Sequence, residues 1–451
     1  MENQENQGNE PKSFLQSNTA KMIMVGLLTL FLLIPLLFVQ DLIRERSERK
    51  NEVDQEIATL WGSDVTFYGP ILRIPYQTYE NYNVTDTKTG ATTIQKRTFT
   101  QYAYFFPNEL NNVSEVKKNE SLKRGIFNPI VFTANMKFNG SFTAPNFAKL
   151  NIPTENVQWD KAAVLVRTTN LKSIKSELSI KLNNEKLLFE PQPEDKSDYS
   201  ILATTLFNYT NLAAGKPIQF HFDIQYNGSN SINFIPIGKI TKVSMDSDWE
   251  SPSLEGSFAA NDATKVVNKD GFHADWKILD INRTFSQQYA ASLPNLDDYK
   301  FGVKLIDTVD EYQQNERVSK YGFLVIGLTF LIFFLIQSVS KISIHIFQYS
   351  MIGIALIMFY TLLISITEHS SFSLAYAIAG TAVITMITLY SISILKNRKF
   401  ALFIAAALTV LYSFIYVIIQ MEDYALLVGS IGLFLILGAV MYFSRKIDWG
   451  K

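Results

Sequence analysis

The 451-residue sequence is 47% hydrophobic and has a formal net charge of −1, a balance that gives no general reason to expect a nucleic-acid partner. It contains no cysteine, which excludes disulfides, thiolate nucleophiles and metal sites with cysteine ligands. The apolar residues concentrate near the amino terminus and after position 320, whereas the middle is polar, so we expect a membrane part and a separate water-facing part.

Residues 1–20 are polar and show little pattern, so we expect a disordered cytoplasmic tail. Residues 21–40 contain an uncharged apolar run that is long enough to cross the hydrocarbon layer as a helix. A cleaved signal peptide is the alternative, but the run is longer than a signal-peptide core and no small-residue cleavage site follows it. We therefore predict an uncleaved signal anchor, in which Pro35 kinks the helix without ending it.

Helical patterns flank the polar middle of the chain. In residues 41–61, apolar positions recur at roughly helical spacing, which predicts a helical stalk that Gly62 can end. Residues 310–320 predict a second helix that leads into the next span. Between these two helices, residues 62–309 are expected to form a separate domain.

This domain has the residue pattern of β structure. Asn139-Gly140 and Asn227-Gly228 are dipeptides typical of tight hairpin turns. We predict a mostly antiparallel, sandwich-like β domain. Alternating apolar positions with aromatic and β-branched residues predict its strands at 98–106, 129–142, 162–168 and 218–226.

Two segments of the β domain resemble each other. Residues 139–144 (NGSFTA) and 255–260 (EGSFAA) each precede a tryptophan and a strand at nearly the same spacing. An internal duplication, with two similar β units divided near 191–200, would explain this similarity, and chance is the alternative.

Five more apolar segments of about 20 residues follow the β domain, and each is long enough to cross a membrane. With the first span, they predict a bundle of six transmembrane helices that ends in a short cytoplasmic tail at 444–451. The five segments are residues 321–340, 344–366, 372–394, 400–419 and 424–443.

The charges of the short connectors set the expected orientation of the spans. Lys and Arg occur on alternate connectors and in the carboxyl-terminal tail, whereas the other two connectors are acidic and lack Lys and Arg. This pattern predicts both termini in the cytoplasm and residues 41–320 outside. Four basic residues after the first span oppose this orientation locally, but glutamates are interleaved with them: Arg44, Arg46, Arg49 and Lys50.

Four side chains in the two acidic connectors form the candidate site. Glu368 and His369 lie in one connector, Glu422 and Asp423 lie in the other, and the expected topology places both at the outer membrane surface. If the connectors meet, these side chains could hold a divalent cation or pair with a basic patch. The alternative is that they are solvated loop residues.

Patterns of known catalytic sites are absent from the sequence. It has no HExxH motif, nucleophile elbow or Gly-rich phosphate loop, and we interpret each of its four histidines as structural. No ionisable residue lies deep inside a predicted span, which disfavours a proton- or ion-coupled carrier. We therefore expect neither an enzyme nor a bound cofactor.

A series of short motifs runs in order from Arg44 to Trp449 and resembles the CreD family of bacterial inner membrane proteins, which is associated with cell-envelope integrity. The motifs include Trp61-Gly62, Gly69-Pro70-Ile71-Leu72-Arg73-Ile74-Pro75-Tyr76, Trp249-Glu250-Ser251-Pro252-Ser253, Gly271-Phe272-His273-Ala274-Asp275-Trp276, Ser365-Ile366-Thr367-Glu368-His369 and Ile447-Asp448-Trp449. Within them we interpret Gly69-Pro70 as a turn and Pro75 as a strand end. Six motif residues are read as structural anchors: Trp61, Gly69, Pro70, Pro75, Trp249 and Trp276.

The resemblance implies an inner membrane location with the large domain in the periplasm. It also implies a link to envelope stress through a two-component system, colicin tolerance and responses to β-lactams, and it supplies no catalytic residue. Our leading hypothesis is a non-enzymatic protein of the lipid bilayer whose periplasmic β domain binds or senses an envelope protein or glycan. The alternative is a transporter or channel through the helical bundle.

Overall fold

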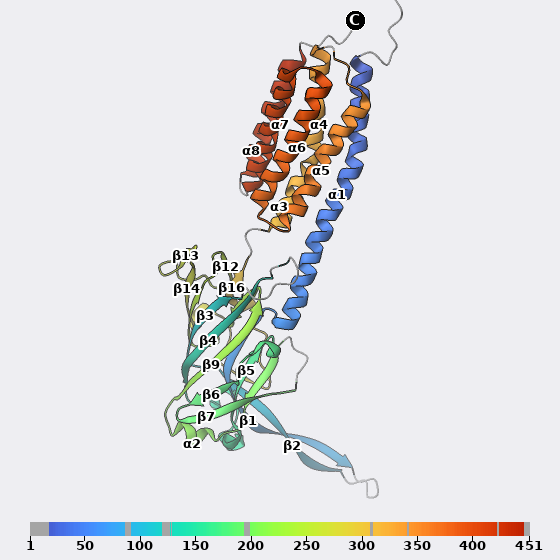
Figure 1. The fold of residues 1–451 in the computed structure, drawn as a ribbon. Helices are drawn as coiled ribbons and strands as arrows, with labels where there is room; N and C mark the ends of the chain where they lie inside the picture. Colours follow the sequence, from blue (N-terminus) through green and yellow to red (C-terminus); the bar gives the residue numbers. More distant parts are fainter. Residues whose placement is uncertain are drawn as a thin grey trace, which may run out of the picture. The chain divides into compact units, whose positions relative to one another are not determined.

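The structure, a computed structural model, describes residues 18–85, 92–119, 127, 129–193, 199–306, 310–340, 342–421 and 424–445. The chain divides into two compact units, which are residues 1–51 with 309–451 and residues 52–308. The first unit is helical and the second is built from strands (Figure 1). Of the tail that we expected to be disordered, residues 1–17 lie outside the described residues and residues 18–20 are helical.

The helical unit confirms the predicted set of one amino-terminal and five carboxyl-terminal spans. Among the residues that the structure describes, six helices of this unit are long and apolar enough to cross a membrane, and α3 is a shorter polar helix that precedes α4. The helices are α1 (Asn18–Trp61), α3 (Glu311–Lys320), α4 (Gly322–Ser340), α5 (Ile346–Thr367), α6 (Phe372–Leu395), α7 (Arg398–Gln420) and α8 (Ala425–Ser444).

Apolar and aromatic side chains of α4 to α7 form the core of this bundle, together with Leu32 and Leu36 of α1. The ring of Phe359 packs edge-on against Tyr412, with 4.6 Å between ring centroids. Pro35 lies inside α1 and does not end the helix. The apolar side chains of α8 are largely exposed, which suits a helix that faces lipid.

The second unit is one 16-stranded sheet that is mostly antiparallel, with parallel pairing of β1 to β10 and of β3 to β11. A short helix, α2 (Tyr209–Ala213), precedes β9. The strands are β1 (Val65–Thr85), β2 (Thr92–Phe105), β3 (Glu109–Lys118), β4 (Val131–Phe142), β5 (Ala163–Thr168), β6 (Ser179–Leu182), β7 (Glu185–Pro191), β8 (Ser200–Thr204), β9 (Ile218–Ser229), β10 (Ser231–Phe234), β11 (Ile240–Ser247), β12 (Pro252–Gly256), β13 (Val266–Asn268), β14 (Gly271–Leu279), β15 (Gln288–Ala290) and β16 (Phe301–Leu305).

The sheet folds back on itself and encloses one apolar core, which confirms the predicted sandwich-like β domain. β7 pairs with β6 at its start and with β8 at its end. It therefore joins the half of the sheet from β12 to β8 to the half from β6 to β13. Across the core, Phe67 of β1 stacks on Phe138 of β4 at 4.2 Å. Near the free edges, Trp276 of β14 contacts Phe301 of β16 at 5.6 Å, so the sheet approaches a closed barrel.

Strands from both sides of 191–200 are neighbours in this sheet. β10 pairs with β1, β9 with β4, and β11 with β3. The two segments that resemble each other occupy different places, because residues 139–144 begin in β4 inside the sheet and residues 255–260 begin at the end of the outer strand β12. The β domain is therefore one compact unit.

The two hairpin turns predicted from Asn-Gly dipeptides are wrong. Asn139-Gly140 lies within β4 and Asn227-Gly228 within β9. The glycines serve close packing instead, because a Cβ on Gly140 would lie 1.9 Å from the carbonyl oxygen of Glu109, and a Cβ on Gly228 would lie 2.5 Å from the ring of Phe132. Tertiary contacts thus override the local turn preference.

The interpretations of Gly69-Pro70 as a turn and Pro75 as a strand end are also wrong, since all three residues lie within β1. Gly69-Pro70 sits at an irregularity in the pairing of β1 with β5, where the register shifts between Tyr68 and Ile71. The pairing of β1 with β5 ends at Arg73, and Pro75 lies beyond it. Although proline has no backbone N–H, no hydrogen bond between β1 and β5 is lost at this position.

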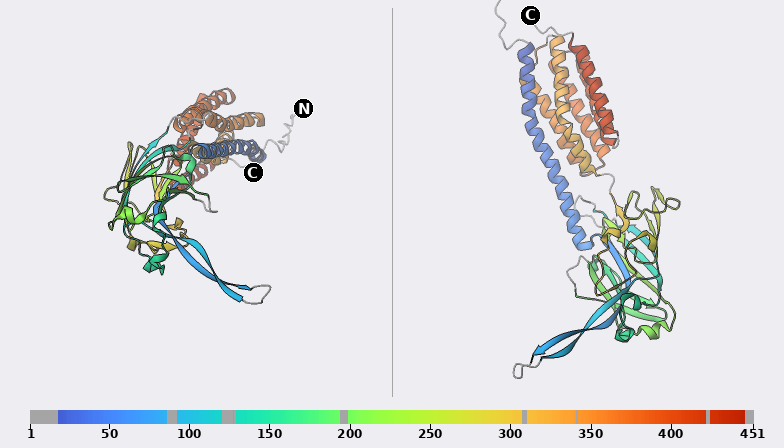
Figure 2. Two further views of the ribbon diagram at one scale, coloured as in Figure 1. Left: turned by 90° about the horizontal axis from the view of Figure 1, so that it is seen from below. Right: turned by 180° about the vertical axis from the view of Figure 1, so that it is seen from behind.

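β1 and β2 continue beyond the body of the β domain as a two-stranded arm (Figure 2). Their pairing extends from Leu72 opposite Phe105 to Thr85 opposite Thr92. The outer part is exposed on both faces, with Tyr79 at 44% and Ile94 at 73%. A ribbon of this kind buries little apolar surface and contributes little to folding.

We predict that shortening this arm leaves the β domain stable. Replacing residues 79–98 by Asn-Gly joins Thr78 to Phe99, which lie opposite each other. The melting temperature is expected to change by less than about 4 °C, equivalent to about 1 kcal/mol. Tryptophan fluorescence of the full chain can report this, because four of the five tryptophans lie in residues 52–308. Loss of cooperative unfolding in the shortened chain would contradict the prediction, and Phe138→Ala serves as a destabilised reference.

Candidate functional site

The predicted site residue Glu368 lies at the carboxyl-terminal end of α5, where the helix dipole disfavours a negative charge. Its Oε1 atom lies 3.5 Å from Nε of Arg46 on α1, and 17% of its side chain is exposed. Nearby, Nζ of Lys50 lies 3.5 Å from Oδ1 of Asp310, the residue that caps α3. Two ion pairs therefore connect α1 to α3 and to the end of α5.

Tyr312 of α3 lies among these charges. Burial raises its pKa to about 12, Glu368 adds to the increase, and Arg46 opposes it. Tyr312 therefore stays neutral at ordinary pH.

Of the other members of the predicted site, His369 alone lies in the part of the chain that the structure describes. His369 is exposed in the α5–α6 connector. Glu422 and Asp423 lie outside the described residues. Among the residues that the structure describes, no set of three His, Asp or Glu side chains is arranged to hold a metal ion.

The Arg46–Glu368 pair is predicted to stabilise the helical unit. A double-mutant cycle with Arg46→Ala and Glu368→Gln, followed by unfolding in a denaturing detergent, is expected to give a coupling of about 1 kcal/mol, since Glu368 is mostly buried but Arg46 is half exposed. The matched control is the exposed Lys320–Glu316 pair within α3, for which we expect about 0.3 kcal/mol. Equal coupling energies for the two pairs would disprove this role.

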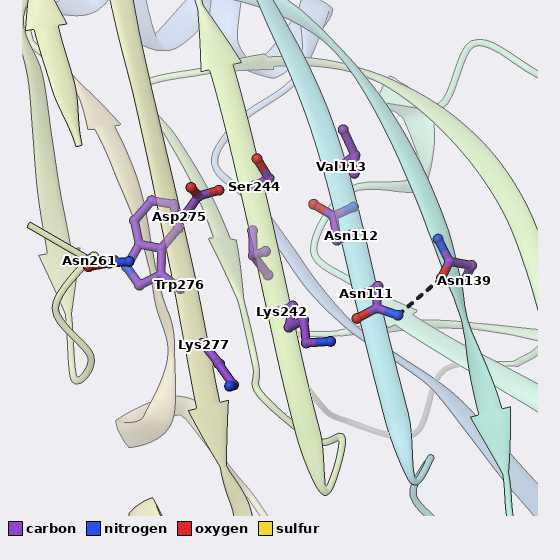
Figure 3. A pocket seen from close by; sticks show the side chains of 11 residues that line it. Asn111, Asn112, Val113, Asn139, Lys242, Ser244, Asn261, Asp275, Trp276 and Lys277 are labelled. Atoms are coloured by element: carbon purple, nitrogen blue, oxygen red, sulfur yellow. Dashed lines mark hydrogen bonds between the residues drawn. The ribbon is translucent and has the colours of Figure 1, made fainter. Parts of the chain in front are cut away.

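A second candidate site is a groove of about 500 Å³ on the outward face of the β domain (Figure 3). It crosses β4, β3, β11 and β14, whose exposed side chains along the groove are mostly polar. The buried side chains of these strands are mostly apolar, although Asn112, Ser114 and Thr241 are buried as well. Asn261, in the loop after β12, covers one side of the groove, and its backbone N–H donates to the carbonyl of Asp275 at 2.7 Å. The polar lining comprises Asn111, Asn112, Asn139, Lys242, Ser244, Asn261, Asp275 and Lys277.

Hydrogen bonds fix several of these side chains. Nδ2 of Asn111 donates to Oδ1 of Asn139 at 3.1 Å, as Figure 3 shows. Nζ of Lys242 donates to Oε1 of Glu109 at 3.2 Å. Hydrogen bonds from Lys242 and then Asn111 lower the pKa of Glu109, so this carboxylate stays charged. The groove therefore presents two amides and one lysine that are held by hydrogen bonds, together with the exposed Lys277.

His273 forms a further cluster beside the groove that sequence analysis missed. Its Nδ1 atom lies 2.7 Å from Asp246 and its Nε2 atom lies 3.0 Å from Asp275. The hydrogen bond with Asp246 is the main cause of the raised pKa of His273, which partial burial opposes and Asp275 reinforces. Partial burial acts to raise the pKa of Asp275, but hydrogen bonds with Ser244, His273 and Thr264 lower it overall.

This cluster gives a pH-dependent prediction. Because the pKa of His273 is raised above its ordinary value of 6.5, its stabilisation is complete below that value and is lost as pH rises through the raised pKa. His273→Gln should therefore lower the melting temperature at about pH 5.5 and have little effect at about pH 9. The expected cost is below about 1 kcal/mol, since a third of the side chain is exposed. A larger loss at the higher pH would reverse the sign and contradict the prediction.

The tryptophans read as anchors make structural contacts. Nε1 of Trp61 donates to the carbonyl of Phe132, Nε1 of Trp249 donates to that of Ile306, and Nε1 of Trp276 donates to that of Phe258. Trp276 is 2% exposed and lies beneath the groove.

Comparison with known proteins identifies the family. The family model described as "Inner membrane protein CreD" matches residues 17–450, which include both units. The chain belongs to the CreD family. A CreD-family relative, "Inner membrane protein CreD" of Escherichia coli strain K12, is 26% identical over 426 residues, which cover 93% of this chain and 91% of the relative. Both findings agree with the order of motifs in the sequence.

Two of the solved structures that match this CreD-family chain align over half of its length. A putative nutrient binding protein of Legionella pneumophila aligns with 7% identity and a TM-score of 0.24, over 50% of this chain and 73% of that one. Yeast LTA4 hydrolase aligns with 5% identity and a TM-score of 0.21, over 50% and 35%. Scores this low carry no argument about fold or function.

Proposed function

We propose that this CreD-family protein is a non-enzymatic membrane protein whose β domain lies in the periplasm and binds a component of the cell envelope, a glycan or a protein, in support of envelope integrity. The groove across β4, β3, β11 and β14 carries this proposal. It is concave and built on paired strands, and it combines polar side chains with the apolar Val113, Val243 and Trp276, which are features of a recognition surface.

The charges of the connectors support the proposed orientation. Glu368 and His369 precede α6, whereas Lys396, Arg398 and Lys399 follow it, and α6 is long enough to cross a membrane. Basic connectors favour the cytoplasmic side, so the amino-terminal end of α6 should face outward.

The absence of cysteine allows a direct test of orientation. Single cysteines are introduced at Asn81 in the arm and at Lys399, both exposed. A membrane-impermeant maleimide should label Asn81→Cys in intact spheroplasts and Lys399→Cys only after the membrane is permeabilised. The reverse pattern would refute the periplasmic placement.

Binding at the groove can be tested in growing cells with a photo-crosslinking amino acid. Val113 lies in the groove and is 51% exposed, so a crosslinker there reaches a bound molecule without replacing a buried side chain. The matched control is the exposed Lys149 in the short 3-10 helix Ala148–Leu150, which follows β4. An adduct that forms at position 113 and not at 149 supports the proposal, whereas no adduct at 113 or equal adducts at both would contradict it.

The helical bundle offers less support for the transporter or channel alternative. Besides tyrosines, the buried polar side chains described within its spans are uncharged, and they are Thr329, Gln337, Thr367 and Ser391. Gln337 is satisfied by the hydroxyl of Tyr349, which donates to its Oε1 atom at 2.9 Å. These groups suit packing between helices better than a path for ions.

A further inference from the structure

A single row of polar side chains crosses seven strands of the β domain on its outward face. The pairing registers connect each member to the next, from β14 through β11, β3, β4, β9 and β6 to β7. None of the seven members is a carboxylate, and none is buried. We call it the basic row, and its members are Lys277, Lys242, Asn111, Asn139, His221, Lys181 and Lys186.

Like charges face each other at both ends of the basic row. Lys277 lies opposite Lys242, and Lys181 lies opposite Lys186. Directly opposed like charges destabilise a sheet. Glu109 partly neutralises Lys242, but the ion pairs found among the described residues include none with Lys277, Lys181 or Lys186. The fold thus keeps one uncompensated and one partly compensated pair of opposed lysines, and an anionic ligand would relieve the repulsion in both.

The basic row and the groove are continuous. Lys277, Lys242, Asn111 and Asn139 line the groove and follow one another across four strands in Figure 3. With neighbouring strands about 4.8 Å apart, six steps give a surface about 29 Å long. Lysines stand at both ends and amides, which can bond to hydroxyl groups, stand between them.

We propose that the basic row binds an extended anionic glycan that lies across the strands, an inference that rests on the proposed binding function of the groove. A peptide recognised by a sheet usually adds to an edge and runs along the strands, where backbone groups are free. The basic row instead runs across the strands, most of which are paired on both sides, so recognition must come from side chains alone. Lysines for anionic groups and asparagines for hydroxyls match a charged sugar chain.

The test uses the full chain in nanodiscs of zwitterionic lipid, with polygalacturonate oligomers as the probe. Affinity is measured at low and at physiological salt, and should fall with salt because exposed charges are screened. We expect K242Q/K277Q and K181Q/K186Q each to weaken binding by about 5- to 10-fold. The control K149Q/K172Q removes two exposed lysines outside the row and should leave affinity unchanged. K181Q/K186Q should not lower the melting temperature, because it removes a repulsive pair.

Two further polymers discriminate between ligand classes. Neutral dextran should bind at least tenfold more weakly than polygalacturonate, and equal binding would overturn the role of the lysines. If polyglutamate binds more tightly than polygalacturonate, with the same dependence on the lysines, the glycan assignment is overturned in favour of an acidic peptide. If polygalacturonate does not bind but the crosslinker at position 113 still captures a molecule in cells, this inference fails while the proposed function stands.

Discussion

Gly140→Ala is expected to lower the melting temperature of the β domain by about 6–12 °C. A Cβ at this position would lie 1.9 Å from the carbonyl oxygen of Glu109 and 2.6 Å from the ring of Phe220. The first of these atoms is backbone, so relief requires β3 and β4 to move apart. Overpacking of this severity costs about 3 kcal/mol, and a domain of this size loses about 2–4 °C per kcal/mol.

The same substitution should disturb the groove, because Leu110 lies opposite Gly140 and the next pair is Asn111 with Asn139. Thermal unfolding followed by tryptophan fluorescence measures the loss. Asn139→Ala is the matched control, since it alters an exposed neighbour on the same strand, and should cost less than about 0.5 kcal/mol. A Gly140→Ala chain that melts within 2 °C of the parent would show that β3 and β4 yield more easily than their spacing indicates.

Local physical constraints explain which parts of this fold can be predicted from sequence. The spans are predictable because hydrocarbon thickness sets their length, and 344–366 and 372–394 agree with α5 and α6 within two residues. Strand alternation is equally local, so 218–226 corresponds to β9. The motif-based family assignment holds because the family model matches residues 17–450.

Non-local pairing explains what the sequence did not reveal. Gly140 is needed because the backbone of β3 lies close to it, and β3 is not adjacent to it in the sequence. The Asn-Gly dipeptide alone indicates a turn. The alternation of Phe272, His273, Ala274 and Asp275 could have placed His273 and Asp275 on one face. Their contact with Asp246 requires the register of β11 against β14, which no local pattern contains.

In the candidate sites, too, local patterns identify single residues, but their partners depend on contacts that are distant in the sequence. Glu368 was identified from the charge of its connector, but its partner Arg46 is more than 300 positions away in the sequence. The basic row combines six pairing registers, and its lysines are unremarkable when read one strand at a time. Function assigned to a sheet surface therefore requires the strand order first.

Trp276→Ala is expected to cause the second large loss, about 3–5 kcal/mol of the stability of the β domain. The side chain is 2% exposed, its ring lies 5.6 Å from that of Phe301, and its Nε1 donates to the carbonyl of Phe258 at 3.2 Å. Truncation leaves a cavity where β14 meets β16 and leaves that carbonyl without its donor. Trp276→Phe keeps most of the ring contact, so we expect it to lose only about 1–2 kcal/mol.

Differential scanning calorimetry suits this measurement, because the substitution removes a fluorophore. Trp249→Ala is the control, since Trp249 makes a similar hydrogen bond to Ile306 but is only partly buried, and it should cost less than Trp276→Ala. Trp276 also lies beneath the groove, so its loss should weaken polygalacturonate binding together with stability, whereas K242Q/K277Q should weaken binding alone. If Trp276→Ala were tolerated within about 1 kcal/mol, the closure of the sheet through β14 and β16 would not depend on this side chain.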